Sequence, residues 1–244
     1  MQAVILAGGI GTRLRPLTES IPKAMVPVQG RPFLEYELGL LKSNGVDDVV
    51  LCVGYLGEQI ERHFGDGTWF GVKIRYSRDG NLPLGPIGAL KNAQEMLEGE
   101  FFVTYGDAYL RLSYQNMMDV LRQSDALGLM AVYWNRGEYG RSDVIVRGNQ
   151  IVEYNKKEDK PGMDWINFGV SALRKSALER VRRGEFCDEE SFYGGLIRDR
   201  QLRAFEVRER FYEIGTPIGL DEFTAHVKAK PGFYIAPREW KKPT

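Results

Sequence analysis

Residues 3–18 read AVILAGGIGTRLRPLT, an apolar run that opens into a glycine-rich turn with two arginines. A short apolar run before glycines predicts a buried parallel strand that ends in a tight turn. Glycine lets backbone N–H groups approach an anion because no Cβ stands in the way. Arg13 and Lys23, ten residues apart, would add the positive charge that a polyphosphate needs. The stretch therefore predicts a nucleoside triphosphate pocket.

The same turn differs from two common phosphate-binding loops. Leu14 stands where the dinucleotide fingerprint G-x-G-x-x-G needs its third glycine, which argues against a nicotinamide or flavin cofactor. No Gly-Lys-Ser/Thr sequence closes the turn, so it is not a Walker A loop.

Composition limits the classes of partner. The chain has 244 residues, enough for one large domain with a sizeable core. Lys and Arg together number 33, as do Asp and Glu, so no bulk charge recruits nucleic acid or an anionic membrane. The sequence has no apolar stretch long enough to predict a membrane helix. A chain that opens directly on a predicted strand argues against a cleaved signal peptide. The distant Cys52 and Cys187 fit structural thiols of a reducing compartment, so we expect a cytoplasmic protein.

Strand and helix signals alternate along the first half of the chain. Strands are expected over 3–6, 49–53, 72–77 and 101–104, and helices over 32–44, 57–64, 87–97 and 113–122. Repeated βαβ units predict an α/β fold: a Rossmann-like, doubly wound, mostly parallel sheet with helices on both faces.

The second half has a different pattern. Two short alternating runs, 143–146 and 151–154, flank Gly148 and predict a β-hairpin. Further strands are expected over 166–173, 203–207 and 211–214, with helices over 175–182, 189–200 and from Pro217 onward.

One acidic residue stands at a position typical of a ligand site. Asp107 follows the apolar strand 101–104, and ligands of open α/β sheets bind at the carboxyl ends of strands. A carboxylate that faces a triphosphate suits Mg²⁺, which prefers oxygen ligands. Taken alone, a strand-end Gly-Asp pair is more often a turn or a helix cap.

The opening stretch resembles the start of the sugar-1-phosphate nucleotidyltransferases, or NDP-sugar pyrophosphorylases. Their pattern L-A-G-G-x-G-T-R-L-x-P-L-T, followed by P-K and then P-V, is matched from Leu6 to Val28. The likeness continues, more thinly, at 84–90, 106–107, 156, 167–169 and 213–217. The short chain is similar to the compact branch with heptose-1-phosphate guanylyltransferase and N-acetylmuramate-1-phosphate uridylyltransferase. The implied fold is that of the nucleotide-diphospho-sugar transferases.

The resemblance also implies site residues. Arg13 would clamp the triphosphate, Lys23 would neutralise the reacting phosphoryl group, and Asp107 would hold the metal. Glu213, in place of the family's Asp, would be the second metal ligand. The implied nucleotide-binding residues are Leu6, Ala7, Gly8, Gly9, Gly11, Thr12, Arg13 and Gly88. The implied sugar-phosphate-binding residues are Tyr105, Asn155, Lys156, Asn167 and Gly169.

The implied activity is Mg²⁺-dependent transfer from a nucleoside triphosphate, GTP favoured, to a hexose or heptose 1-phosphate. Uridylyl, thymidylyl or cytidylyl transfer remains open, as does a phosphorylated non-sugar alcohol as acceptor. A non-catalytic regulatory module that binds nucleotide or sugar phosphate is the rival of another class. We expect one domain over 1–244, with a nucleotide-binding half 1–112, a sugar-phosphate half 113–227 that includes the hairpin, and a tail 228–244. A homo-oligomer remains open.

Overall fold

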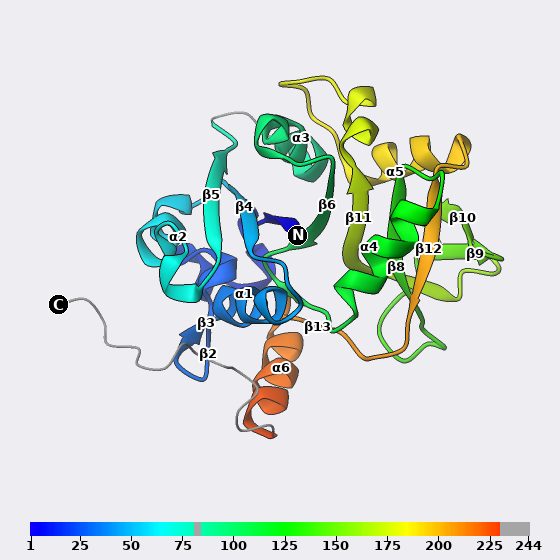
Figure 1. Ribbon diagram of the computed structural model, residues 1–244. Helices are drawn as coiled ribbons and strands as arrows, with labels where there is room; N and C mark the ends of the chain where they lie inside the picture. Colours follow the sequence, from blue (N-terminus) through cyan, green and yellow to red (C-terminus); the bar gives the residue numbers. More distant parts are fainter. Residues whose placement is uncertain (81–83, 230–244) are drawn as a thin grey trace.

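A nine-stranded sheet forms the centre of the protein (Figure 1). The computed structural model describes residues 1–80 and 84–229. In spatial order the strands are β5 (Lys73–Arg78), β4 (Asp48–Val53), β1 (Gln2–Leu6), β6 (Glu100–Tyr105), β11 (Trp165–Arg174), β8 (Gly128–Trp134), β12 (Leu202–Val207), β10 (Gln150–Tyr154) and β9 (Val144–Arg147).

Strand direction divides this sheet into two parts. The strands β5, β4, β1 and β6 run parallel, so their carboxyl ends meet at one edge. Beyond β6 the sheet is mixed, because β11 pairs antiparallel with both β6 and β8. The predicted α/β fold class is confirmed, and the parallel arrangement describes its first half.

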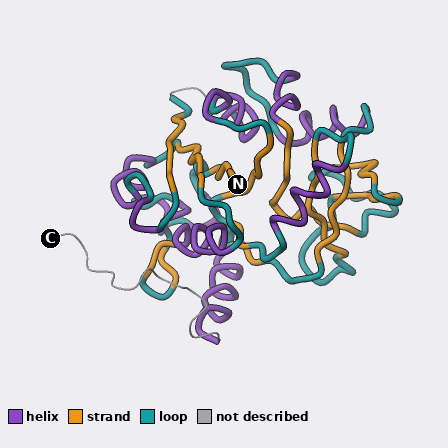
Figure 2. The backbone as a smooth tube through the Cα atoms, in the orientation of Figure 1, coloured by secondary structure: helices purple, strands orange, loops and turns teal. Residues whose placement is uncertain are grey.

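Helices cover both faces of the sheet, as Figure 2 shows in purple against the orange strands. The α-helices are α1 (Phe33–Ser43), α2 (Gly57–Phe64), α3 (Gly85–Asn92), α4 (Tyr114–Gln123), α5 (Glu189–Arg198) and α6 (Pro217–Ala229). Short 3-10 helices lie at Thr12–Leu14, Leu17–Glu19, Lys23–Met25, Thr68–Phe70, Gln94–Met96 and Lys175–Arg180. Two small ribbons pair β2 (Pro27–Val28) with β3 (Arg31–Pro32) and β7 (Ala108–Tyr109) with β13 (Tyr212–Glu213).

Side chains that alternate along the strands pack into two separate hydrophobic cores, one on each face of the sheet. Ile5 of β1 packs with residues of α1, α2 and α4 on one face, whereas Val4 packs with residues of α3 and α5 on the other. Successive side chains of a strand point to opposite faces, so a strand buried on both faces reads as a continuous apolar run. This accounts for the apolar stretch that opens the sequence.

A third hydrophobic core lies beneath α6 and fixes the position of the segment that follows β13. Phe223 of α6 packs edge-on against Phe33 of α1, with ring centroids 5.0 Å apart. Tyr36 packs at 5.6 Å from the same ring. These contacts hold α6, and with it the 213–217 segment, close to the N-terminal region.

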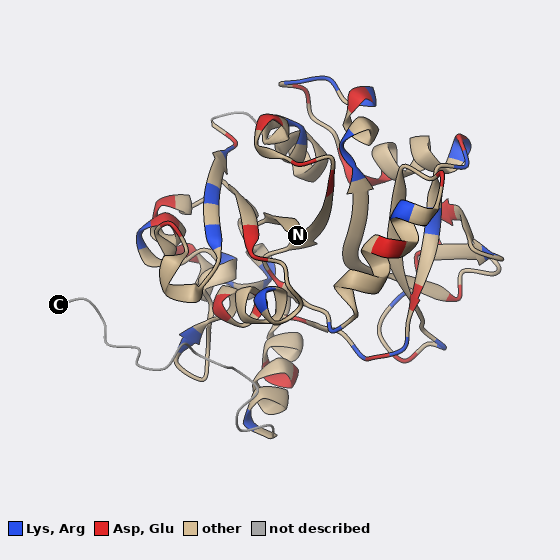
Figure 3. Ribbon diagram, in the orientation of Figure 1, with Lys and Arg blue, Asp and Glu red and all other residues tan. Residues whose placement is uncertain are grey.

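Local signals in the second half are also met. The β9–β10 hairpin forms as expected, with Gly148 at a φ of 61° in its turn. The Ser113 side chain accepts a hydrogen bond from Asn116 N and caps α4. The helix expected over 175–182 is a 3-10 helix, Lys175–Arg180. The proposed tail falls outside the described residues from position 230 onward. Figure 3 shows acidic and basic residues interspersed along the ribbon, in keeping with the zero net charge.

Candidate active site

The glycine turn after β1 is held by close contacts that only small residues permit. Gly11 has a φ of 62°, and a Cβ there would lie 3.0 Å from Thr18 Cγ2 and 3.2 Å from Lys23 Cβ. The Thr18 hydroxyl donates a hydrogen bond to the Gly11 carbonyl at 2.7 Å. Gly11 therefore lets the following segment fold back against the turn, which brings Lys23 beside it.

A cavity of 670 Å³ opens at the carboxyl ends of the parallel strands. Its lining residues are Leu6, Ala7, Gly8, Gly9, Ile10, Lys23, Ala24, Cys52, Gly54, Tyr55, Asp79, Gly80, Leu84, Gly85, Pro86, Ala89, Tyr105, Gly106 and Asp107. We name it the turn cavity. Four of the expected nucleotide-binding residues, Leu6 to Gly9, line the turn cavity. A turn that binds phosphate must lie at the wall of such a cavity.

The other expected nucleotide-binding residues lie elsewhere. Gly11 and Thr12 are not among the residues that line the turn cavity. Gly88 in α3 faces the loop before α5, where a Cβ would lie 2.8 Å from the Glu185 carbonyl oxygen. Its backbone N–H donates to the Cys187 carbonyl at 3.3 Å. The geometry thus gives Gly88 a role in packing α3 against this loop.

The expected cationic and acidic side chains converge on Gly215. A Cβ on Gly215 would lie 3.0 Å from Arg13 Nη2, 3.2 Å from Lys23 Nζ and 3.4 Å from Asp107 Oδ2. The Lys23 ammonium donates directly to the Asp107 carboxylate. Arg13 and Gly215, which are 202 positions apart in the chain, therefore meet at one point.

A second cavity of 220 Å³ adjoins this cluster. Its walls are Arg13, Tyr105, Asp107, Ala108, Lys156, Asn167, Phe168, Gly169, Glu189, Phe211 and Glu213. We name it the lysine cavity. Because Tyr105 and Asp107 line both cavities, the two are neighbours with a shared wall.

Four of the five expected sugar-phosphate residues line the lysine cavity: Tyr105, Lys156, Asn167 and Gly169. Asn155 is not among them. Its side-chain oxygen accepts hydrogen bonds from the backbone N–H groups of Lys157 and Glu158, at 2.8 and 3.0 Å. Asn155 thereby stabilises the turn that presents Lys156.

An acidic residue that the sequence analysis did not single out organises the lysine cavity. Glu189, which is 9% exposed, accepts hydrogen bonds from the Tyr105 hydroxyl and the Lys156 ammonium. Burial by itself lowers the pKa of Lys156, but the Glu189 carboxylate outweighs it and the net shift is upward. Burial, reinforced by the Glu189 charge, holds the pKa of Tyr105 well above its usual value. In the sequence, an acidic residue next to the helix cap Asp188 reads only as a helix-terminus charge.

A second buried acid fixes the strand that carries Asn167. Asp143 accepts a hydrogen bond from the Asn167 backbone N–H at 2.7 Å. The Asn167 side chain donates in turn to the Tyr154 hydroxyl at 3.3 Å. Burial raises the pKa of Asp143 to about 6. The polar groups around the lysine cavity are thus tied together from four separate strands and helices.

The two proposed metal ligands lie beside one pair of strands: Glu213 is in β13, and Asp107 directly precedes β7. Glu213 in β13 stands opposite Ala108 in β7, and the Ile214 N–H donates to the Asp107 carbonyl at 2.9 Å. Both carboxylates line the lysine cavity. Within residues 1–80 and 84–229, no group of three or more His, Cys, Asp or Glu side chains gathers around one point. Two carboxylates with the remaining positions left to water and phosphate fit Mg²⁺, which keeps several waters when bound.

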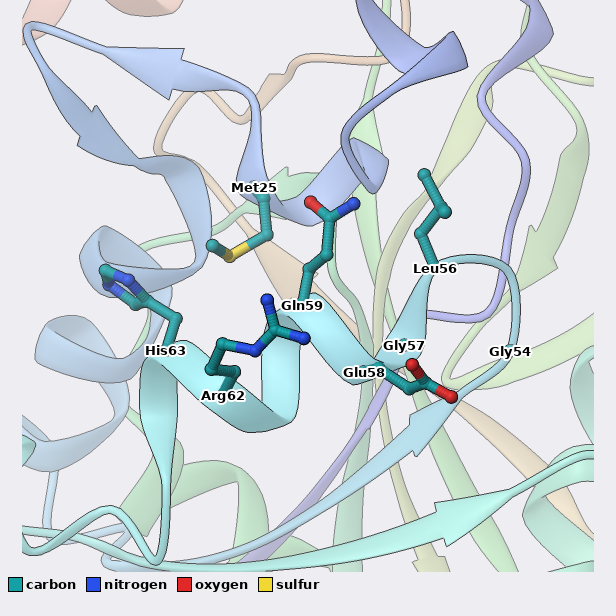
Figure 4. A pocket seen from close by; sticks show the side chains of 8 residues that line it. All are labelled: Met25, Gly54, Leu56, Gly57, Glu58, Gln59, Arg62 and His63. Carbon is teal, nitrogen blue, oxygen red and sulfur yellow. The ribbon is translucent and has the colours of Figure 1, made fainter.

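A third cavity, of 710 Å³, lies along α2 (Figure 4). Its lining residues are Met25, Gly54, Leu56, Gly57, Glu58, Gln59, Arg62 and His63. None of the expected site residues lines it. The candidate active site is therefore the pair of cavities that meet at Asp107.

The sequence and the fold identify the family. Residues 2–177 match the family described as nucleotidyl transferase. The chain therefore belongs to the nucleotidyl transferase family, which is a family of enzymes. Enzymes of this family generally depend on a divalent metal ion.

Two curated relatives illustrate the range of the match. A UTP–glucose-1-phosphate uridylyltransferase of Synechocystis is 40% identical over 204 residues, which cover 77% of this chain and 53% of that protein. A D-glycero-alpha-D-manno-heptose 1-phosphate guanylyltransferase of Campylobacter jejuni is 32% identical over 217 residues, which cover 89% of this chain and 96% of that protein. The chain thus spans about half the length of the first relative and nearly all of the second.

Solved structures agree with the fold. HddC from Yersinia pseudotuberculosis, in complex with GMP-PN, has a TM-score of 0.76 at 28% identity, covering 94% of this chain and 99% of that one. A structure from Bacillus anthracis has a TM-score of 0.82 at 18% identity, covering 94% and 96%, and supports the fold alone. Among the helices of residues 1–80 and 84–229, none has the length and apolar character to cross a membrane.

Proposed function

We propose that the protein transfers the nucleotidyl group of a nucleoside triphosphate, GTP favoured, to a hexose or heptose 1-phosphate and releases pyrophosphate. One observation carries the proposal: the turn cavity and the lysine cavity share Tyr105 and Asp107. A triphosphate bound under the glycine turn and a phosphate bound at Lys156 would meet at that shared wall.

The reaction needs positioning more than proton transfer. An oxygen of the sugar phosphate forms a bond to the α-phosphorus, and the bond from that phosphorus to the bridging oxygen breaks. The electron pair of the broken bond leaves with pyrophosphate. The attacking oxygen is already anionic, so catalysis rests on orientation and on stabilising charge.

The proposed side-chain roles follow from charge and placement. Arg13 would hold the leaving pyrophosphate, since its planar guanidinium matches two phosphate oxygens. Lys23, a point charge beside Asp107, would neutralise the reacting centre. Lys156 would bind the incoming phosphate, with Asn167 and Tyr105 orienting the acceptor.

Asp107 and Glu213 would hold Mg²⁺. When bound, the ion neutralises phosphate oxygens and so lowers the repulsion between the two anionic substrates. Glu213 has one methylene more than the Asp of the family motif, so it can reach the same point from a slightly greater distance.

The proposed division of labour follows the cavities. Residues 1–112 contribute the walls of the turn cavity, and residues 113–227 contribute Lys156 and most of the lysine cavity. Transfer of a different nucleotide remains the alternative, because relatives named for uridylyl and guanylyl transfer both match.

Both Cys52 and Cys187 are free thiols, which suits the reducing cytoplasm, where we propose that the protein acts.

Pyrophosphate release tests the proposal. The protein would be incubated with Mg²⁺ and every pairing of GTP, UTP, dTTP, CTP and ATP with glucose, mannose and heptose 1-phosphates and phosphocholine. We expect release with GTP and a sugar phosphate, loss of release on chelation by EDTA, and an NDP-sugar product by mass spectrometry. No release under any pairing would favour the non-catalytic binding module.

A further inference from the structure

Asp79 is a carboxylate of the turn cavity to which the proposed reaction gives no role. It follows β5 at the carboxyl end of that strand, and its N–H donates to the Val53 carbonyl at 3.2 Å. Its Oδ1 is buried and has no hydrogen-bond partner among residues 1–80 and 84–229. A buried polar atom without a partner is unfavourable, and such atoms gather at sites where a ligand supplies the missing bond.

Two glycines make room for this carboxylate. A Cβ on Gly8 would lie 2.9 Å from Asp79 Oδ2, and one on Gly54 would lie 3.5 Å from it. Any larger residue at Gly8 would therefore press on the Asp79 side chain. The ends of β5, β4 and β1 are thus fitted to one another around a carboxylate.

No cation neutralises Asp79 within the described part of the chain. The neighbouring Arg78 is directed elsewhere, since its Nε donates to Glu61 at 2.7 Å. Burial raises the pKa of Asp79 to about 6. At pH 7.5 the group is therefore ionised and offers hydrogen-bond acceptors only.

The sheet places Asp79 at the end of the turn cavity remote from the reaction centre. Asp79 follows β5 and Asp107 follows β6, and β4 and β1 lie between these two strands. Three strand spacings separate the axes of β5 and β6 by about 14 Å. A nucleotide that has its phosphates at Arg13, Lys23 and Asp107 would extend its base toward Asp79, between the apolar side chains of Leu84, Pro86 and Ala89.

The chemistry of a carboxylate then selects among the bases. Its two oxygens accept a pair of parallel N–H bonds, and such charge-assisted pairs are strong. Guanine offers that pair, N1–H and the 2-amino group, on one edge. Uracil and thymine offer one N–H between two carbonyl oxygens, and the amino groups of cytosine and adenine stand next to an unprotonated ring nitrogen. The bases other than guanine would each bring a lone pair against the carboxylate.

We propose that Asp79 binds the N1–H and 2-amino groups of guanine and thereby makes GTP the preferred nucleotide. This inference rests on the proposed function, because it names the base that the turn cavity accepts. It assigns Asp79 as a specificity-determining residue.

Equilibrium binding in the presence of Mg²⁺ tests the assignment without requiring turnover. The wild type should bind GTP at least about 10-fold more tightly than inosine triphosphate, which lacks only the 2-amino group. The substitution Asp79→Asn replaces one acceptor by a donor, so its amide pairs with the N3–H and O4 groups of uracil or thymine. We expect the ratio of GTP to UTP affinity to fall by about 10²-fold or more in this variant.

The matched control is Asp125→Asn, at a side chain 83% exposed and remote from both cavities, which should leave every affinity unchanged. Equal binding of GTP and inosine triphosphate by the wild type would overturn the proposal, and this test needs no variant. So would an unchanged GTP to UTP ratio in a folded Asp79→Asn protein. Failure of the proposed function has a different signature, namely nucleotide binding with a guanine preference but no pyrophosphate release.

Discussion

In the turn cavity the Asp79 carboxylate keeps one oxygen without a partner among the described residues, whereas Lys156 and Asp107 of the lysine cavity already have side-chain partners. Lys156 is bonded to Glu189, Tyr105 to the same carboxylate, and Lys23 to Asp107. The first region presents an acceptor for a ligand's donors. The second must exchange internal bonds for ligand bonds when an anion enters.

This difference bears on how each region recognises its ligand. An unpartnered carboxylate rejects a base that lacks the right donors, because nothing else satisfies it. A paired lysine remains neutralised until a phosphate displaces or joins its partner, so binding there gains only the difference between two ion pairs. We therefore expect specificity to reside mainly in the turn cavity, and variants of the two regions should behave differently.

The largest effect is expected where the regions meet. Asp107→Ala removes a carboxylate that lines both cavities and that holds Lys23. We expect turnover to fall by about 10²–10³-fold, the scale for losing one electrostatic stabiliser. Steady-state pyrophosphate release measures it, with Asp125→Ala as the surface control. A folded variant with near-normal turnover would contradict the role given to Asp107.

Gly215→Ala tests whether the meeting point is crowded. The added methyl would stand 3.0 Å from Arg13 Nη2 and 3.2 Å from Lys23 Nζ, so both cations must move. Displacing charged groups by about 1 Å can cost up to about 10²-fold in rate. We expect kcat to fall by about 10–10²-fold with little change in thermal stability, because the displaced atoms are ends of flexible side chains. Gly99→Ala, where a Cβ meets nothing within 4 Å, is the control.

Substitutions of two adjacent lysines distinguish a role in the lysine cavity from a role at the surface. Lys156→Ala removes the cavity cation, whereas Lys157→Ala removes a neighbour whose side chain is 76% exposed. A hydrogen bond to a charged group contributes about 1.5–3 kcal/mol, so the KM for the sugar phosphate should rise by about 10–10²-fold in Lys156→Ala. The KM for GTP should stay within about 2-fold. Equal effects of the two substitutions on the sugar-phosphate KM would place the anion site outside the cavity.

The two regions also differ in how far the sequence predicted them. The glycine turn, its strand and Asp107 follow from local patterns, because a parallel strand end and its turn are contiguous in the chain. Neither β8 nor Glu189 was predicted. The run GLMAVYW of β8 is apolar throughout, so periodicity does not distinguish it from a buried helix. Glu189 gains its role only from Tyr105 and Lys156, which are 84 and 33 positions away.

Asp79 illustrates the same limit in the parallel part of the sheet, whose strands the sequence predicted. In the sequence it precedes Gly80, and an Asp-Gly pair is typical of a turn. Its side chain lies against Gly8 and Gly54, which follow the strands β1 and β4. Local signals identify strand ends, but the absence of a partner for a buried oxygen depends on the whole sheet.

The smallest expected effect concerns the stability cost of that unpartnered oxygen. Burial raises the pKa of Asp79 from 3.8 to about 6, so the folded protein binds this proton more tightly than the unfolded chain does. The stability that Asp79 protonation provides is therefore present at low pH and is lost as pH rises through about 6. Asp79→Asn cannot ionise, so at pH 7.5 and without nucleotide its melting temperature should exceed that of the wild type by about 2–4 °C.

At pH 4.5 the difference in melting temperature between Asp79→Asn and the wild type should be smaller, because most of the wild-type carboxyl is then protonated in the folded state. Saturating GTP at pH 7.5 should reverse it, since a ligand stabilises the protein that binds it more tightly. Thermal unfolding of wild type, Asp79→Asn and Asp125→Asn under these three conditions measures all of this. A variant that is less stable than the wild type without nucleotide would mean that the Asp79 carboxylate already has a partner in the free protein, and the contrast between the two regions would then fail.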